Sequence, residues 1–140
     1  MSAIQTLFDR YGESHQNAFN KRVHWVCVPL ITFSLLGLLW AATPWLALGF
    51  AVFALVYYIR LSLPIAAGML LVAGAMLVVL SQMPHVLEIS VLIFVLAWVG
   101  QFVGHKVEGK KPSFFDDIKF LLVGPAWLLG FIYRRLGIAY

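Results

Sequence analysis

Charged residues are scarce in this chain of 140 residues. They make up 11% of the sequence, whereas hydrophobic residues make up 62%. Water-soluble domains carry about 25% charged residues, so the composition excludes a soluble globular domain. The mean hydropathy of +0.91 points the same way. We therefore expect an integral membrane protein, organised as a single membrane domain over residues 1–140.

Cysteine is also rare, because Cys27 is the only one and cannot form an internal disulfide. It lies in an apolar run, and we interpret it as a small buried hydrophobe. Residues 1–20 lack the apolar core of a cleavable signal peptide. The sequence has six acidic and ten basic residues, which gives a net charge of +4. The basic residues flank apolar runs, which indicates membrane topology and argues against nucleic-acid binding.

Two long stretches are almost free of charge. No Asp, Glu, Lys or Arg occurs from Val23 to Ile59, and Glu88 is the only one from Leu61 to His105. A helix that crosses a bilayer needs about 20 apolar residues, so each stretch has room for two spans. The spans that we predict cover residues 23–40, 45–59, 64–80 and 86–104, with turns at 41–44 and 81–84.

Two shorter apolar segments flank these spans. Residues 4–13 have apolar side chains at helical spacing, which is typical of an amphipathic helix in the membrane interface. Residues 120–133 contain Gly124-Pro125 and are too few for a span, so we expect a re-entrant or interfacial segment. The predicted fold is thus all-α: four transmembrane helices, an N-terminal interfacial helix and this C-terminal segment.

The basic residues predict the orientation in the membrane. With four spans, both termini and all ten Lys and Arg residues lie on one side, and the two short turns carry none. The positive-inside rule then places both termini in the cytoplasm. So compact a chain would suit a bacterial inner membrane or an endoplasmic reticulum, and we expect the bacterial inner membrane. His15, His24 and His105 fall on the cytoplasmic side, whereas His85 falls roughly 30 Å away on the other.

His15 and His24 are nine residues apart. On one straight helix this spacing would put them on opposite faces, because each residue turns the helix by about 100°. If both bind one metal ion, the chain must break between them, and residues 16–20 contain asparagines that favour turns and helix caps. We therefore expect Asn20 to cap the first span, one turn before His24.

A second group of polar residues lies at the end of the fourth span. Gln101, His105 and Glu108 stand at positions i, i+4 and i+7, which form one stripe if the helix continues through Gly104. Polar groups facing hydrocarbon are unfavourable, so this stripe should face the bundle or a cavity. Lys110 and Lys111 follow and could meet an anionic substrate.

From the residues alone, several readings stay open. Three imidazoles with open coordination positions suit zinc, iron or copper. The histidines and asparagines could instead cap helix ends at the interface of a membrane scaffold that has no catalytic activity. A third reading is an electron-transfer protein with a haem held by two histidines.

A resemblance to a known family favours the first reading. The chain is similar to a membrane family of 2-hydroxy fatty acid dioxygenases, and the similarity covers both polar motifs, the four spans between them and Gly124-Pro125. The motifs that carry it are Tyr11-x3-His15-x-Asn17-x2-Asn20-x3-His24-x4-Pro29 and Trp98-x2-Gln101-Phe102-x-Gly104-His105.

The resemblance implies an Fe(II) enzyme that shortens 2-hydroxy fatty acids by one carbon with O2. It implies iron binding by His15, His24 and His105. Asn20 and Gln101 also match motif positions, and we expect them, with Glu108, to orient the histidines in the catalytic site. Some members carry an acid four residues beyond the last histidine, whereas Glu108 is three beyond it.

Overall fold

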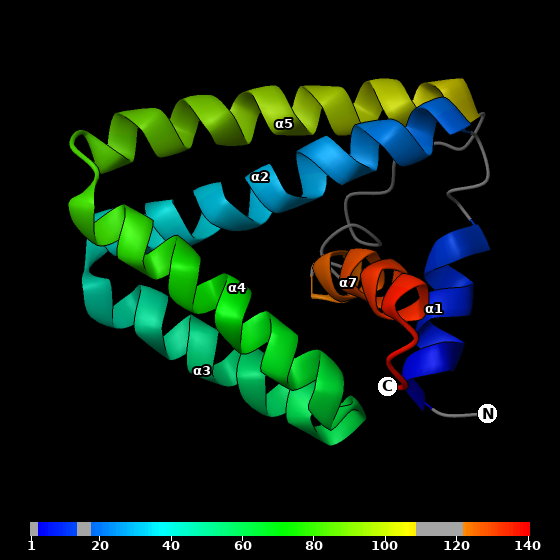
Figure 1. Ribbon diagram of the computed structural model, residues 1–140. Coiled ribbons are helices and arrows are strands. Elements are labelled where there is room, and N and C mark those ends of the chain that lie inside the picture. Colours follow the sequence, from blue (N-terminus) through cyan, green and yellow to red (C-terminus); the bar gives the residue numbers. More distant parts are fainter. Residues whose placement is uncertain (1–2, 14–17, 109–121) are drawn as a thin grey trace.

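The computed structural model describes residues 3–13, 18–108 and 122–140, and the elements within these ranges are all helices (Figure 1). This confirms the predicted all-α fold. The helices are α1 (Ala3–Glu13), α2 (Ala18–Ala42), α3 (Pro44–Leu61), α4 (Leu63–Gln82), α5 (Val86–Glu108) and α7 (Val123–Leu136).

Four of these helices are long and apolar enough to cross a membrane, as predicted. The qualifying stretches are Trp25–Ala42, Pro44–Leu61, Leu63–Gln82 and Val86–Gly104. Large apolar side chains on their outer faces are exposed, with Trp45 at 80% and Leu71 at 75%. Such surfaces are stable when they face lipid, where helices satisfy their own backbone hydrogen bonds.

Local sequence signals set the ends of α3 and α4. Pro44 is the first residue of α3, where its missing N–H would have had no partner in the helix. Ser62 ends α3 and caps α4, because its hydroxyl oxygen accepts a hydrogen bond of 3.4 Å from the Ile65 backbone N–H. Pro64 lies in the first turn of α4, as the sequence predicted.

The four spans form two pairs that diverge like the arms of a V (Figure 1). One arm is the antiparallel pair of α2 and α5, and the other is the pair of α3 and α4. The arms meet at the short turns around residues 43 and 83–85. They are apart at the opposite end of the bundle, where α1, α7 and the C-terminus lie; we call that end the terminal face.

α2 and α5 pack closely because small residues lie between them. A methyl group added to Gly37 would overlap the hydroxyl oxygen of Ser90. One added to Gly100 would lie 2.7 Å from the sulfur of Cys27, which is buried as predicted. Small residues let helix backbones approach in a membrane, where packing replaces the hydrophobic effect as the main source of association.

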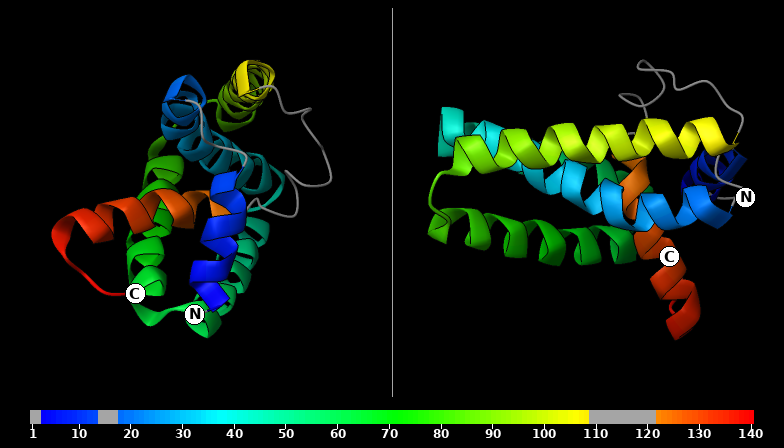
Figure 2. Two further views of the ribbon diagram at one scale, coloured as in Figure 1. Left: turned by 90° about the vertical axis from the view of Figure 1, so that its right-hand side faces the viewer. Right: turned by 90° about the horizontal axis from the view of Figure 1, so that it is seen from above.

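α7 fills the open end of the V and runs across the spans rather than along them (Figure 2). Its buried Trp127 belongs to a core cluster that includes Tyr58 and Met69 from the α3–α4 arm. The Tyr58 hydroxyl donates a 2.6 Å hydrogen bond to the Leu122 carbonyl, just before α7 begins. The structure thus agrees with a segment that does not span.

α1 packs against the outer side of α7. Phe8 is 2% exposed, and a methyl group added to Gly130 would lie 2.8 Å from its ring. The Phe8 ring also contacts Tyr140, with the ring centres 5.7 Å apart. The two short helices and the C-terminus therefore form one apolar assembly that closes the terminal face.

Candidate metal centre

The structure brings His24 and His105 to the same end of the bundle. His24 lies in the second turn of α2, and His105 lies in the last turn of α5, both at the terminal face. The structure describes the backbone at these two positions. His15 lies outside the described residues.

The packing of α2 against α5 sets the relative height of the two histidines. The contacts at Gly37 and Gly100 fit one antiparallel register between the helices. Continued toward the terminal face, this register puts His24 level with Val103 and His105 level with Arg22. The two positions then differ in height by about 3 Å, because an α-helix rises about 1.5 Å per residue.

Helical spacing also places each histidine in line with buried residues. His24 is one and two turns from Val28 and Ile31, both buried. His105 is one turn from Gln101 and two turns from Ala97, which are buried at 5% and 3% exposure. Both positions are therefore in helical register with residues that are buried nearer the middle of the bundle.

Gln101 is the one predicted site residue whose side chain the structure describes, and it faces the protein interior. Its Oε1 atom is buried and accepts no hydrogen bond from the described residues. An unpartnered buried oxygen is unfavourable, typically by about 1–3 kcal/mol. An imidazole that binds a metal through one nitrogen has an N–H on the other to donate, and glutamine can accept it. The buried oxygen one turn from His105 thus fits a metal centre.

Apolar side chains close the centre on its membrane side. Cys27 and Ile31 on α2 pack with Ala97 on α5, and Phe94 and Trp98 cover this cluster. The rings of Phe94 and Trp98 meet edge to face at 6.1 Å. These apolar side chains separate the candidate centre from the rest of the helix interface.

Basic residues surround the same end of the helix pair. Arg22 and Lys106 are exposed and stand next to the two histidine positions in the α2–α5 register. Arg60, Arg134 and Arg135 are exposed farther along the terminal face. An anionic headgroup would be attracted to this face. Lys110 and Lys111, which the sequence suggested could meet an anionic substrate, lie outside the described residues. Arg22 and Lys106 were not predicted, although both lie within two residues of a histidine in the sequence.

One local prediction was wrong. Asn20 does not cap the first span, because α2 begins at Ala18 and Asn20 lies inside its first turn. A cap at Asn20 would start the helix at Lys21, whereas the described helix already includes Ala18, three residues earlier. By contrast, α5 does continue through Gly104 and ends at Glu108, so Gln101, His105 and Glu108 share one stripe as predicted.

His85 lies at the other end of the molecule. It is exposed in the turn between α4 and α5 and has a positive φ of 52°. The twenty residues from His85 to His105 follow α5 and correspond to about 30 Å. His85 is thus separate from the positions of His24 and His105, as the predicted topology requires.

Metal binding itself stays a prediction. Among the residues whose side chains the structure describes, no three His, Cys, Asp or Glu residues lie close enough to hold an ion. The three predicted ligands are not in that set. The helices place His24 and His105 at the same end of the bundle and at nearly the same height, with the buried Gln101 oxygen nearby.

Comparison with known proteins identifies the family. No curated protein and no solved structure matches the chain. A family model described as 2-hydroxy-palmitic acid dioxygenase Mpo1-like matches residues 1–61 and 64–136, which include both polar motifs and all four spans. The resemblance seen in the sequence is thereby confirmed, and the chain belongs to the Mpo1-like family of 2-hydroxy-palmitic acid dioxygenases.

Proposed function

We propose that this protein is an Fe(II)-dependent dioxygenase that shortens 2-hydroxy fatty acids by one carbon. Membership of the Mpo1-like family supports a dioxygenase that acts on a hydroxylated fatty acid. The observation that carries the proposal is the α2–α5 register, which sets the backbone positions of His24 and His105 about 3 Å apart in height. Beside them lies the buried Gln101 oxygen, which has no partner among the described residues.

In this proposal His15, His24 and His105 hold the iron. Bound Fe(II) would supply open coordination positions and charge stabilisation, which bring the acid and O2 together. Gln101 accepts a hydrogen bond from one of the imidazoles and so fixes its orientation. Asn20 and Glu108, at the first turn of α2 and the last turn of α5, belong to the same group of supporting residues.

The position of the centre suits a lipid substrate. The polar head of a fatty acid sits at the membrane interface, where α2 begins and α5 ends. Arg22 and Lys106 are exposed beside the histidine positions and attract the carboxylate. The charge distribution supports an orientation with this face in the cytoplasm, and we propose a bacterial inner membrane.

The proposed reaction balances without an external reductant. C1 leaves as CO2, and C2 becomes the carboxyl carbon of an acid one carbon shorter. The hydroxy acid supplies the four electrons that reduce O2, and one water is released. The proposal thus predicts equal amounts of O2 consumed, CO2 released and shortened acid formed.

Oxygen consumption by protein purified without O2 and loaded with iron tests this function. With 2-hydroxypalmitate we expect O2 uptake matched by pentadecanoic acid and CO2. Palmitate is the matched control, because it lacks the 2-hydroxyl and should give no uptake. Uptake that is equal for both acids, or that needs an added reductant, would contradict the proposal.

The same preparation distinguishes the two other readings of the histidines. A membrane scaffold without catalytic activity would consume no O2 with any acid after iron loading. A haem protein would show a Soret band in the visible spectrum of the purified protein. The proposed dioxygenase shows O2 uptake and no such band.

A further inference from the structure

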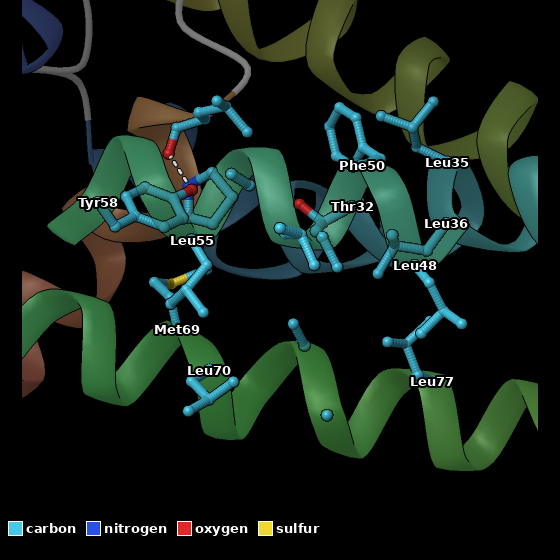
Figure 3. A pocket seen from close by; sticks show the side chains of 17 residues that line it. Thr32, Leu35, Leu36, Leu48, Phe50, Leu55, Tyr58, Met69, Leu70 and Leu77 are labelled. Carbon is cyan, nitrogen blue, oxygen red and sulfur yellow. Dashed lines mark hydrogen bonds between the residues drawn. The ribbon is translucent and has the colours of Figure 1, made fainter. Parts of the chain in front are cut away.

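A cavity of about 220 Å³ lies between α2, α3 and α4, inside the V of the bundle (Figure 3). We call it the span cavity, and 17 residues line it. At one end Tyr58 of α3 lies across from Met69 of α4, and at the other end Leu48 lies across from Leu77. Leu122 and Pro125, beside and within the first turn of α7, close it toward the terminal face.

The lining offers almost nothing to a polar ligand. Of the described residues that line it, Thr32 and Tyr58 alone have polar side chains. The Thr32 hydroxyl donates to the Val28 carbonyl at 3.0 Å, and the Tyr58 hydroxyl donates to the Leu122 carbonyl. An apolar cavity of about 150 Å³ is already large enough to stay dry and bind a small hydrocarbon. The span cavity is larger and equally apolar, so its fitting occupant is hydrocarbon.

The length of the cavity favours a single chain. On α3 the lining residues run from Leu48 to Tyr58, which is about 15 Å of helix. This is half of the roughly 30 Å hydrocarbon thickness, the depth that one acyl chain occupies in one leaflet. A volume of 220 Å³ spread over this length is slender, which favours an extended alkyl chain over a fused-ring lipid.

A second cavity, of about 240 Å³, adjoins the first. It lies between α2, α4 and α7, and it shares Thr32, Met69 and Pro125 with the span cavity. We call it the α7 cavity. Within the described part of its lining, a polar side-chain atom occurs at Thr32 and Trp25 alone. The two cavities therefore form adjoining apolar spaces around the same three side chains.

One face of α2 runs past both cavities and begins beside the backbone position of His24. Trp25 and Pro29 line the α7 cavity, Thr32 lines both, and Leu36 lines the span cavity. These residues stand at i, i+4, i+7 and i+11, so they share one helix face. The stripe starts one residue after His24 and descends about 16 Å into the membrane region.

We propose that the α7 cavity and the span cavity together hold the alkyl chain of the substrate acid, whose head lies at His24, and that Leu48 and Leu77 limit its length. The acid as occupant rests on the proposed function. The site itself rests on the apolar lining, on its length of one leaflet and on the α2 stripe that begins beside His24.

A pair of substitutions on α4 tests this assignment. Ala73 lines the span cavity and is half-buried, so Ala73→Leu fills part of it. Ala75 is exposed on the other side of the same helix and lines neither cavity, so Ala75→Leu adds the same side chain outside. Ala51→Leu fills the same cavity from α3. It replaces Ala73→Leu as the test variant if a thermal melt shows that Ala73→Leu is not folded.

The first readout is the chain length of the preferred substrate. Ala73→Leu should lower kcat/KM for 2-hydroxypalmitate at least about tenfold relative to 2-hydroxydecanoate, because even one methylene can change discrimination in an apolar pocket by about that factor. Ala75→Leu should leave the ratio unchanged. An unchanged ratio in both folded cavity variants, Ala73→Leu and Ala51→Leu, would overturn the proposal.

The second readout requires no turnover. A 2-hydroxy fatty acid with a photoreactive group near its methyl end should crosslink to peptides containing Leu48 or Leu77, in Ala75→Leu but not in Ala73→Leu. Crosslinks to outward-facing residues such as Leu71 in every variant would contradict the cavity as the binding site of the alkyl chain. They would not contradict the proposed dioxygenase function. Cavity crosslinks without O2 uptake would overturn the dioxygenase and support the cavity as a fatty-acid site.

Discussion

At the scale of single residues, Gln101 carries the most information about the site. Its side chain is 5% exposed, and its Oε1 finds no partner among the described residues. A buried acceptor without a partner lowers stability, so such a residue needs a compensating role. Its position one turn before His105 offers that role, because an imidazole N–H can donate to it once the other nitrogen binds metal.

The substitution Gln101→Leu separates a role in metal binding from a role in packing. Leucine removes the unpartnered oxygen, so we expect the protein to remain as stable as wild type or to gain about 1 kcal/mol. Iron affinity should fall about 10–100-fold, the usual effect of removing a residue that orients a metal ligand. Thermal unfolding and an anaerobic iron titration measure the two effects.

Ser90→Ala is the control for that experiment. Ser90 also has a buried oxygen without a partner among the described residues, and it lies in the same helix interface near Gly37, away from the terminal face. This variant should keep full iron affinity. If both variants lower it equally, Gln101 acts only through helix packing.

The sequence predicted the positions of some of these residues correctly and of others wrongly. The spacing of Gln101, His105 and Glu108 predicted a shared stripe, which α5 confirms. The helix-cap preference of asparagine gave the wrong role for Asn20, because α2 starts earlier than the local signal indicates. Local sequence preferences predict the end residues of a helix poorly, because contacts with other parts of the protein also decide where a helix begins.

At the scale of the helices, the α2–α5 interface determines where the two histidine positions meet. Gly37 faces Ser90 and Gly100 faces Cys27, so the backbones come close at two levels. The register that follows is fixed by small residues whose side chains leave no room for a shift. A disturbance of this interface should therefore alter both stability and the relative height of His24 and His105.

Gly37→Ala is predicted to destabilise the protein by about 1–3 kcal/mol, the usual effect of overpacking. The new methyl group would overlap the Ser90 hydroxyl, so adding Ser90→Ala to the same chain should restore part of the loss. Unfolding in mixed detergent micelles measures both.

Gly49→Ala is the matched control for this change. A methyl group at Gly49 of α3 meets nothing within 4 Å, so alanine should be neutral or stabilise the helix. Equal losses of stability for Gly37→Ala and Gly49→Ala would show that α2 and α5 are not closely packed at Gly37.

The helices themselves were predictable, but their arrangement was not. Long gaps between charges determine where spans fall, because charge is unfavourable in hydrocarbon, and the structure confirms four helices long and apolar enough to span. The V shape and its closure by α7 depend on contacts such as the Tyr58 hydrogen bond to Leu122. Such contacts join residues 64 positions apart, which no local pattern reveals.

At the scale of the whole molecule, charge is sorted by face. The described basic side chains at Arg22, Arg60, Lys106, Arg134 and Arg135 are all exposed at or near the terminal face. The turns at the opposite end carry no Lys or Arg. The distribution predicts that the terminal face lies in the cytoplasm.

Cysteine labelling tests this orientation. Cys27 is buried, so wild-type protein should not react with a membrane-impermeant maleimide and provides the background. Ser81 and Ala139 are exposed at opposite ends. Ser81→Cys should react in intact spheroplasts, whereas Ala139→Cys should react only after lysis. The reverse pattern would place the proposed iron centre outside the cytoplasm.

The central claim is that histidines at the terminal face hold iron, and metal analysis of protein purified without O2 tests it most directly. We predict about one iron per chain in wild type. His24→Ala and His105→Ala should lose it, whereas His85→Ala, at the far end of α5, should retain it. Iron retained in His24→Ala and His105→Ala, or stoichiometric zinc that resists exchange in wild type, would contradict the account.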